Sequence, residues 1–251
     1  MKRFHNKNVI VTGGAGGIGD AVCRRFADEG AQVWIVDSHA DAAAALAENI
    51  CTTGGSAQWR AVNLSQRDEI AAFVAELTAR EARIDVLVNN AGINRRGALL
   101  ELSDADWQET FTVNLDALFH MCRAVLPQMI AQGGGAIVNT ASQWGLHPAP
   151  GHIAYNTSKA AVAAFTLSLA RDYAPHNVRV NAVCPGEVRT PMLESNLARS
   201  GRSLDELNAL VPFGRIGEPA EIAATIAFLA SDEAPYLCGS LLEITGAQAV
   251  A

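Results

Sequence analysis

The sequence predicts an α/β protein, a single doubly wound domain whose parallel sheet of about seven strands carries helices on both faces. Short β-branched or apolar runs alternate with longer stretches of helical spacing along the 251 residues. Such alternation is typical of a parallel sheet that is covered on both sides. No linker rich in Pro, Gly or Ser and no internal repeat divides the chain, so we expect one domain over residues 1–251.

The individual elements follow from the apolar pattern and from its end signals. Strands are predicted at residues 9–11, 33–36, 58–62, 86–88, 136–139, 178–183 and 241–244. Helices are predicted at residues 18–28, 41–50, 67–79, 103–130 and 154–173. Gly30 is a typical C-terminal stop for the first helix, Ser103 is a typical N-cap, and Pro127 is a candidate break in the fourth helix.

The segment 187–217 has no clear strand. Between two units of an α/β fold, a long stretch of this kind is more often a lid over the substrate than a second domain. We therefore expect residues 187–217 to form a substrate lid on the single domain.

Composition excludes several classes of function. The formal net charge of −7 disfavours binding to nucleic acid and to anionic membrane surfaces. No targeting signal is visible, and no apolar run approaches the roughly 20 residues that span a bilayer. The five cysteines are scattered and form no Cys-x-x-Cys pair, which favours reduced thiols in the cytoplasm and no metal site.

A glycine-rich loop over residues 12–19, Thr-Gly-Gly-Ala-Gly-Gly-Ile-Gly, follows the first strand and opens the first helix. Glycines there allow a tight turn and the approach of a pyrophosphate, and the helix N-terminus offers free N–H groups. Glycine also serves ordinary turns, but the strand–loop–helix context favours a Rossmann-like dinucleotide site. The loop does not end in Gly-Lys-Ser/Thr, so hydrolysis of ATP or GTP is not expected.

Asp37 ends the second predicted strand and indicates which cofactor binds. A carboxylate there accepts hydrogen bonds from the adenosine ribose and repels the extra phosphate of NADP. No Arg or Lys lies in the glycine-rich loop or just after Asp37, so the sequence favours NAD. The alternative role for Asp37 is to cap a turn before the second helix.

Tyr155 and Lys159 are four residues apart in a predicted helix and therefore share one face. The chain has three lysines, of which the other two, Lys2 and Lys7, lie in the N-terminal segment. A lone interior lysine in a chain that prefers arginine indicates chemistry that the arginine fork and its high pKa do not serve. The alternative is a solvated lysine on a helix surface.

Together, these motifs resemble those of the short-chain dehydrogenases/reductases, from about Lys7 to Gly246. The cofactor motifs of that family are matched by Thr12, Gly13, Gly17, Ile18 and Gly19, by Asn89, Asn90, Ala91 and Gly92, and by Pro185, Gly186, Val188 and Thr190. Its catalytic residues are matched by Asn114, Ser142, Tyr155 and Lys159. The resemblance implies an NAD-dependent oxidoreductase and a homotetramer that packs through the helices of Asn114 and Tyr155.

The resemblance also implies a role for each catalytic residue. Tyr155 exchanges a proton with the substrate oxygen, and the ammonium of Lys159 lowers the pKa of its phenol from about 10. Lys159 also holds the nicotinamide ribose. Ser142 hydrogen-bonds the reacting oxygen of the substrate, and Asn114 holds a water that links Lys159 to solvent.

Two positions depart from the family pattern. Asn63 stands where the family usually has Asp beside the adenine, and with Leu64 it is still expected to contact the cofactor. The C-terminal stretch reads Thr245-Gly246-Ala247 where many members have Asp-Gly-Gly, so subunit contacts around this tail are not carried over.

The residues expected on the substrate side are polar with one flat aromatic: Arg95, Arg96, Ser142, Gln143, Trp144, His152 and Tyr155. An apolar substrate would leave many of these groups unpaired. The Arg-Arg pair resembles that of the gluconate and keto-deoxy-gluconate dehydrogenases, and arginine pairs carboxylates in a fork. We therefore expect a polyhydroxylated substrate such as a sugar acid, unless both arginines form a solvated loop pair.

Other functions remain open. A 3-oxoacyl-type reductase usually favours NADPH and a long acyl arm, which Asp37 and the polar residues oppose. A dehydrogenase of a neutral polyol or cyclic alcohol is a further alternative. A regulator that only binds NAD is disfavoured because Ser142, Tyr155 and Lys159 are all present.

Overall fold

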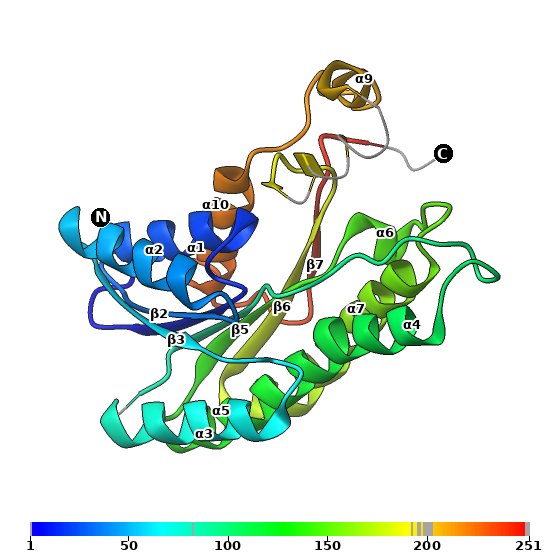
Figure 1. Ribbon diagram of the computed structural model, residues 1–251. Coiled ribbons are helices and arrows are strands. Elements are labelled where there is room, and N and C mark those ends of the chain that lie inside the picture. The colour runs from blue at the N-terminus through cyan, green and yellow to red at the C-terminus, as the bar shows by residue number, and fades with distance from the viewer. Residues whose placement is uncertain (1, 82, 192, 195–196, 198–202, 249–251) are drawn as a thin grey trace.

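A computed structural model describes residues 2–81, 83–191, 193–194, 197 and 203–248 of the chain (Figure 1). Within these residues, seven strands form one parallel sheet in the order β3-β2-β1-β4-β5-β6-β7. This is the strand order of a doubly wound Rossmann-like sheet, in which the order reverses between β1 and β4. The predicted fold class is confirmed.

Each predicted strand is present within about two residues of its expected bounds. The strands are β1 Asn8–Thr12, β2 Gln32–Asp37, β3 Ser56–Ala61, β4 Val86–Asn89, β5 Gly135–Thr140, β6 Val178–Pro185 and β7 Leu241–Ile244. The β-branched residues that are frequent in β1, β2 and β6 suit the pleated and buried surface of a central sheet.

Helices cover both faces of the sheet (Figure 1). On one face lie α1 Gly17–Asp28, α2 Ala40–Thr52 and α10 Pro219–Ala230. On the other lie α3 Arg67–Arg80, α4 Asp104–Phe111, α5 Ala117–Ala131 and α7 Ile153–Tyr173. Shorter elements are the π-helical turn η1 Thr112–Asp116, α6 Gln143–Leu146, the 3-10 turn η2 Ala174–His176 and α9 Leu204–Ala209.

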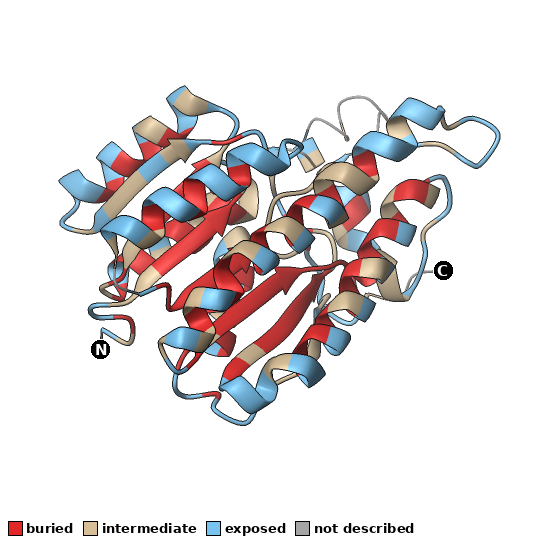
Figure 2. Cartoon of the chain, turned by 90° about the horizontal axis from the view of Figure 1, so that it is seen from below, coloured by how far each residue is buried: buried red, intermediate tan, exposed pale blue. Residues whose placement is uncertain are grey.

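Two apolar cores form because successive residues of a strand point to opposite faces. Val9 and Val11 of β1 pack toward α1 and α10, whereas Ile10 between them packs toward α3 and α5. All three side chains are fully buried. Figure 2 shows the same arrangement, with the central strands red and the outer helix faces pale blue. The sheet is therefore buried on both sides, as expected for parallel strands.

The fourth helical stretch differs from the expectation. Ser103 is the predicted N-cap, and its Oγ accepts a hydrogen bond from Asp106 N at 3.1 Å. The helix is interrupted at η1, which contains Asn114, and it runs through Pro127 inside α5. The prediction of a break at Pro127 is wrong, and the irregular turn lies three to four helical turns earlier.

The helix α10 was not predicted from the sequence. Pro219 stands at its start, and Glu218 and Glu221 form a capping box there. These are ordinary signals of a helix start. The helix is nearly all apolar, because one side packs against the sheet and another against α1. It therefore lacks the polar face that helical periodicity requires.

The two ends of the predicted lid, residues 187–217, are bonded to each other. Val188 and Gly217 form a parallel bridge, with Gly217 N donating to Glu187 O at 2.9 Å and Arg189 N donating to Gly217 O at 2.8 Å. Its described part contains α9 and a small apolar cluster around Leu207, Val211 and Ile216. Residues 192, 195–196 and 198–202 of this segment lie outside the described residues.

Two further properties of the described residues concern membrane-spanning helices and metal sites. No described helix is both long enough and apolar enough to cross a membrane. No three His, Cys, Asp or Glu side chains among the described residues gather in a way that could hold a metal ion.

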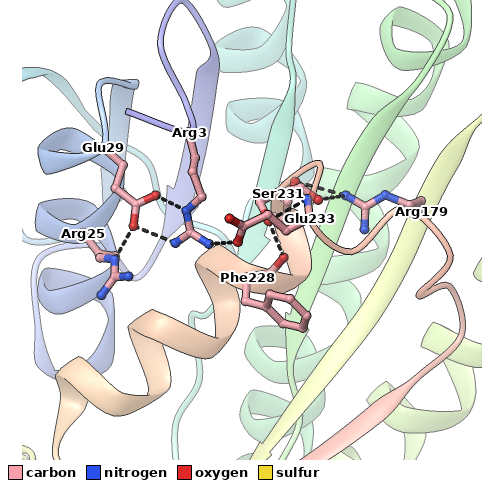
Figure 3. A network of polar contacts seen from close by, with 8 residues as sticks. Arg3, Arg25, Glu29, Arg179, Phe228, Ser231 and Glu233 are labelled. Atoms are coloured by element: carbon pink, nitrogen blue, oxygen red, sulfur yellow. Dashed lines mark hydrogen bonds and ion pairs between the residues drawn. The ribbon is translucent and has the colours of Figure 1, made fainter. Parts of the chain in front are cut away.

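Arg3 joins the N-terminal segment to two helices (Figure 3). Its guanidinium donates to both carboxylate oxygens of Glu29 at 2.5 and 2.7 Å, and to Glu233 at 2.7 Å. Arg25 also pairs with Glu29. On the neighbouring side, Arg179 of β6 donates to three carbonyl groups at the end of α10. Charge-assisted bonds with two parallel contacts are among the stronger polar interactions in proteins.

We expect Glu29→Gln to lower the free energy of unfolding by about 2 kcal/mol at pH 7, since hydrogen bonds to charged groups contribute about 1.5–3 kcal/mol. Burial acts to raise the pKa of Glu29, but hydrogen bonds from Arg3 and Arg25 hold it below the ordinary 4.5. A lowered pKa stabilises the fold above pH 4.5, and this contribution is lost as the pH falls further. Urea denaturation against pH measures both effects.

The exposed Glu76, which pairs with Arg60 at the surface, provides a control. Exposed pairs contribute about 0–1 kcal/mol, so Glu76→Gln should change stability little. Equal losses in the two variants would contradict a special role for Glu29.

Candidate active site

A cavity of about 660 Å³ opens at the carboxyl ends of the strands. It is lined by residues that lie at or just after the end of each strand from β1 to β6, among them Gly13, Asp37, Val62, Asn90 and Thr140. In open α/β sheets, ligands bind in the crevice where the strand order reverses. The position of the cavity is thus a consequence of the topology.

Most of the predicted site residues line this cavity. From the cofactor prediction these are Gly13, Gly17, Ile18, Asp37, Asn63, Leu64, Asn90, Ala91, Gly92, Tyr155, Lys159, Pro185, Gly186, Val188 and Thr190. From the catalytic and substrate predictions they are Ser142, Gln143, Trp144 and Arg96. Four predicted residues, Gly19, Asn114, Arg95 and His152, are not among the lining residues, and their positions are described below.

The glycine-rich loop has the shape of a cradle for a phosphate group. Gly13 has φ +60°, and a Cβ on it would come within 2.8 Å of the Ala91 Cα. A Cβ on Gly19 would lie 2.0 Å from the Gly13 carbonyl oxygen, so Gly19 lies behind the loop and lets α1 approach it. Gly16, the N-cap of α1, faces open space. The loop excludes side chains where a pyrophosphate would meet the helix N-terminus, and so it fits a dinucleotide.

Thr12 and Asn90 couple this loop to the segment after β4. The Asn90 side chain donates to the carbonyl oxygens of Thr12 and Gly13 at 3.3 and 3.1 Å. In return, Thr12 Oγ1 accepts from the backbone N–H groups of Asn90 and Ala91 at 3.1 and 3.3 Å. Both walls of this part of the cavity therefore have a fixed spacing.

Asp37 both holds a turn and faces the cavity. One carboxylate oxygen accepts from Ala15 N at 3.1 Å, and the other accepts from His39 N at 3.0 Å. Its side chain is 12% exposed. Asp37 therefore does cap the turn before the second helix. The same two bonds fix its carboxylate at the edge of the cavity.

Ser142, Tyr155 and Lys159 meet at the junction of β5 and α7. Ser142 is the N-cap of α6 just after β5, and its side chain hydrogen-bonds Tyr155. Lys159, one turn further along α7, donates from Nζ to the carbonyl oxygen of Thr140 at 2.8 Å. The Nζ atom lies 5.8 Å from the centroid of the Tyr155 ring. One turn of α7 and the end of β5 thus bring the three side chains together.

Burial opposes the charged forms of both titratable groups. It raises the pKa of Tyr155, against a hydrogen bond from Ser142 that lowers it, and the charge of Glu187 raises it further. Burial also lowers the pKa of Lys159 from 10.5 to about 8. The lowering of the Tyr155 pKa expected from Lys159 is therefore opposed by the desolvation of both groups.

Asn114 lies outside the cavity wall and braces it. Its Oδ1 accepts from Ile93 N at 2.8 Å, and its Nδ2 donates to Ile93 O at 2.9 Å and to Ser158 Oγ at 3.0 Å. A Cβ on Gly92 would lie 3.3 Å from Asn114 Oδ1 and 3.2 Å from Lys159 Nζ. The π-helical turn thus brings the amide close to Lys159 across Gly92, and the expected water-holding role stays a prediction.

The two adjacent arginines have different positions. Arg95 pairs with Glu109 at 2.8 Å and with Asp106 at 3.6 Å, both on α4, and its side chain is half exposed. Arg96 lines the cavity and has no ion pair among the described residues. Arg95 therefore lies at the surface, as the alternative of solvated loop arginines expects. Arg96 instead lies where a residue that contacts the substrate is expected.

His152 lies behind Trp144 and not on the cavity wall. The two ring centroids are 4.6 Å apart, and His152 Nδ1 lies 3.0 Å from Asn94 Oδ1. Burial, together with the charge of Arg96, lowers the pKa of His152 to about 4. His152 therefore packs against Trp144 outside the cavity lining, and its expected contact with the substrate stays a prediction.

Gln143 and Glu187 complete the substrate side. Gln143 is buried, and its Nε2 donates to Gln248 Oε1 at 3.1 Å, which holds the C-terminal segment against the cavity. Glu187 lines the cavity, but it was not among the residues predicted from the sequence. Its place directly after the Pro185-Gly186 motif is the signal that could have identified it.

We expect Lys159→Met to raise the free energy of unfolding at pH 7. At 1.36 kcal/mol per pKa unit, keeping this buried lysine charged costs about 3 kcal/mol, and the lost charge-assisted bond to Thr140 offsets about 1.5–3 kcal/mol of this cost. Between pH 8 and 10.5 the unfolded chain binds more protons, so wild-type stability should rise over this range and that of Lys159→Met should not. Denaturant titrations at several pH values check this.

The exposed Lys2 is the matched control, because its replacement by Met removes an equal charge without relieving burial. A Lys159→Met variant less stable than wild type at pH 7 would contradict the estimate of the burial cost.

Comparison with known proteins places the chain in a family. The family model of the short chain dehydrogenases matches residues 7–200. The 3-oxoacyl-acyl-carrier-protein reductase FabG of Thermotoga maritima is 39% identical over 97% of this chain and 98% of that protein. The D-threitol dehydrogenase of Mycolicibacterium smegmatis is 39% identical over 97% of this chain and 93% of that protein.

A solved structure of a related protein also closely resembles the structure of this chain. A protein of Beutenbergia cavernae, provisionally assigned as an NAD(P)-dependent gluconate 5-dehydrogenase and carrying NADP at low occupancy, has a TM-score of 0.92 and 36% identity. The match covers 98% of this chain and 97% of that one. With the sheet order and the site geometry above, the chain belongs to the short-chain dehydrogenase/reductase family of oxidoreductases.

Proposed function

We propose that this protein is an NAD(H)-dependent oxidoreductase that interconverts a secondary alcohol and a ketone in a polyhydroxylated compound, a sugar acid or a keto-deoxy sugar acid. The observation that carries the proposal is that Ser142, Tyr155 and Lys159 meet in a cavity whose far end has the glycine-rich cradle and Asp37. The single domain 1–251, with residues 187–217 as its lid, belongs to the same proposal.

The residues present fit a nicotinamide cofactor. The backbone from Gly13 to Gly19 would hold the pyrophosphate, Asp37 the adenosine ribose, and Asn63 and Leu64 the adenine. On the nicotinamide side, the lining residues are Asn90, Ala91 and Gly92, with Pro185, Gly186, Val188 and Thr190. The bound cofactor supplies the hydride chemistry.

The protein's own residues move the proton. Tyr155 is the proposed general acid/base at the substrate oxygen, and the hydrogen bond from Ser142 lowers its pKa against the effect of burial. Lys159 contributes a positive charge beside Tyr155, and its bond to the Thr140 carbonyl oxygen holds its ammonium group in place. Asn114 holds the loop of Ile93 in place and, in this proposal, a water that connects Lys159 to solvent.

The preference for NAD rests on Asp37. Its carboxylate is held by two backbone N–H groups at the cavity edge, so it cannot easily turn away from a 2′-phosphate. The structure from Beutenbergia cavernae carries NADP, so the family fold alone does not decide the cofactor.

The substrate proposal rests on Arg96 and Trp144. Arg96 supplies a guanidinium to the cavity that can pair a carboxylate, and Trp144 offers a flat apolar face to a carbon chain. The threitol and gluconate dehydrogenase assignments among the relatives support a polyhydroxylated substrate. The resemblance to FabG favours a 3-oxoacyl substrate as the second candidate.

A homotetramer and a cytoplasmic location are part of the proposal. Large apolar side chains remain partly exposed on the helices expected to pack between subunits, with Trp107 at 37%, Phe119 at 40% and Leu167 at 42%. The location is supported by the scattered thiols, which form no disulfide among the described residues.

We expect the purified protein to form NADH from NAD with polyols or sugar acids, and Tyr155→Phe to lose this activity. The variant keeps the ring and loses only the hydroxyl group, and general acid/base groups contribute about 10²- to 10⁴-fold. Absorbance at the nicotinamide band measures turnover, and fluorescence titration with NADH should show unchanged binding. Turnover of Tyr155→Phe within twofold of wild type would overturn the mechanism.

We expect the wild type to prefer NAD over NADP by about 2–4 kcal/mol, or roughly 30- to 1000-fold in kcat/KM. Asp37→Asn removes the negative charge and should bring the ratio close to one by improving the use of NADP. The exposed Asp41 on α2 is the control, and Asp41→Asn should leave the ratio unchanged. Equal use of both cofactors by the wild type would refute the role of Asp37.

We expect Arg96→Ala to raise KM for an acidic substrate such as gluconate by roughly 10- to 100-fold, since a charge-assisted bond contributes about 1.5–3 kcal/mol. Arg95→Ala is the matched control, because Arg95 already pairs with acids of α4 and should change KM less than about twofold. The reverse order of the two effects would refute the assignment of Arg96.

A further inference from the structure

His39 lies beside the carboxylate that faces the adenosine end of the cavity. Its ring Nδ1 is 3.0 Å from Asp37 Oδ1, and the same carboxylate oxygen accepts the backbone N–H of His39 at 3.0 Å. Ser38 Oγ lies 3.4 Å from this ring nitrogen. Asp37, Ser38 and His39 all line the cavity. The carboxylate proposed to bind the adenosine ribose is therefore in contact with a side chain that can gain a proton.

Other charges are absent from the described lining residues at this end of the cavity. The rest of that lining, from the glycine-rich loop and the segment after β3, has no titratable side chain: Gly13, Ala15, Gly16, Gly17, Ile18, Val62, Asn63, Leu64 and Ser65. The charged residues of the neighbouring elements lie outside the lining: Asp20 and Arg24, paired on α1, Asp41 on α2, and Arg67, Asp68 and Glu69 in the first turn of α3. Glu69 accepts the backbone N–H of Asn63 at 2.7 Å. The His39 side chain is 83% exposed, so protons from solvent reach it.

The two protonation states of His39 give this end of the cavity different charges. Histidine is the side chain whose charge ordinarily changes between pH 5 and 8. With a neutral ring, the negative charge of Asp37 stands alone and repels the 2′-phosphate of NADP. With a protonated ring, an imidazolium lies against Asp37 and can donate an N–H to a phosphate oxygen. An Arg near this position accommodates the 2′-phosphate in NADP-binding folds, and protonated His39 supplies a comparable cation.

We propose that His39 is a cofactor-specificity residue: its neutral form leaves the preference for NAD intact, and its protonated form admits NADP. The two cofactors differ only in the 2′-phosphate, so the protonation of His39 should act mainly on NADP. NAD keeps its contact with Asp37, because the backbone N–H groups of Ala15 and His39 hold that carboxylate whatever the charge of the ring. This inference rests on the proposed function, since it takes Asp37 to bind the adenosine ribose.

Calorimetric titration of the full chain with NAD and with NADP, at pH 6.0, 7.0 and 8.0, tests the proposal without any substrate. We expect the ratio of the NADP Kd to the NAD Kd to fall as the pH falls, because His39 gains its charge. A 2′-phosphate itself takes up a proton near pH 6, so part of this fall does not depend on His39. His39→Gln keeps a polar side chain without the charge and measures that part. Between pH 8.0 and 6.0, the fall should be about 5- to 10-fold larger in the wild type than in His39→Gln, the range of one exposed charge-assisted bond.

Two further variants sharpen this comparison. His39→Arg holds its charge at every pH tested, and at pH 8.0 we expect it to bind NADP about 5- to 10-fold more tightly than the wild type. Its affinity for NAD should change less than about twofold. His176→Gln is the matched control, because His176 is exposed on η2, which precedes β6 and therefore lies at the edge of the sheet opposite the cavity. This variant should keep the wild-type pH dependence.

The same pH dependence of the ratio in the wild type and in His39→Gln would overturn this inference and leave the proposed function standing. A His39→Arg variant that binds NADP no better than the wild type at pH 8.0 would overturn it as well. Failure of the wild type to bind either cofactor at any of these pH values would overturn the proposed function, and this inference with it.

Discussion

The hydrogen bond from the buried Lys159 ammonium to Thr140 fixes the geometry of the site. This bond ties α7 to the end of β5. Tyr155 on α7 and Ser142 just past β5 are therefore held at fixed positions relative to each other. Neighbouring segments must then come very close. A Cβ on Gly145 would lie 2.6 Å from the Lys159 backbone, and one on Gly92 would lie 3.2 Å from its Nζ. The small residues around Lys159 are thus required by its position.

The regular parts of the fold could be predicted from local pattern alone. The strands β1, β2, β4, β5 and β6 are short apolar runs whose two faces are largely buried, whereas the edge strands β3 and β7 are only partly buried. The dinucleotide cradle could be predicted for the same reason, because Gly13 and Gly19 serve local backbone geometry. The helix α10 was not predicted because burial on two sides removes the polar face from its sequence. Pro219 and the Glu218–Glu221 capping box nevertheless mark its start.

The rest of the site depends on contacts between distant segments, which a local pattern does not contain. Arg95 and Arg96 are adjacent and chemically identical, and the acids Asp106 and Glu109 of α4 draw Arg95 into surface ion pairs while Arg96 lines the cavity. His152 is displaced by Trp144, whose ring covers it. The π-helical turn at Asn114 is fixed by bonds to Ile93 and Ser158 from two other elements. Glu187 becomes a candidate site residue only because the fold places it in the lining of the same cavity as Tyr155.

The bridge between Val188 and Gly217 has a consequence for how this scaffold diversifies. Because both ends of the intervening segment are tied to each other, its length can change without moving β6 or α10. The entropic cost of a longer loop grows slowly, by about 0.6 kcal/mol for each doubling of length. Insertions and deletions after Thr190, which lines the cofactor side of the cavity, should therefore cost little stability. New pocket shapes can arise at this one place while the redox machinery beneath stays unaltered.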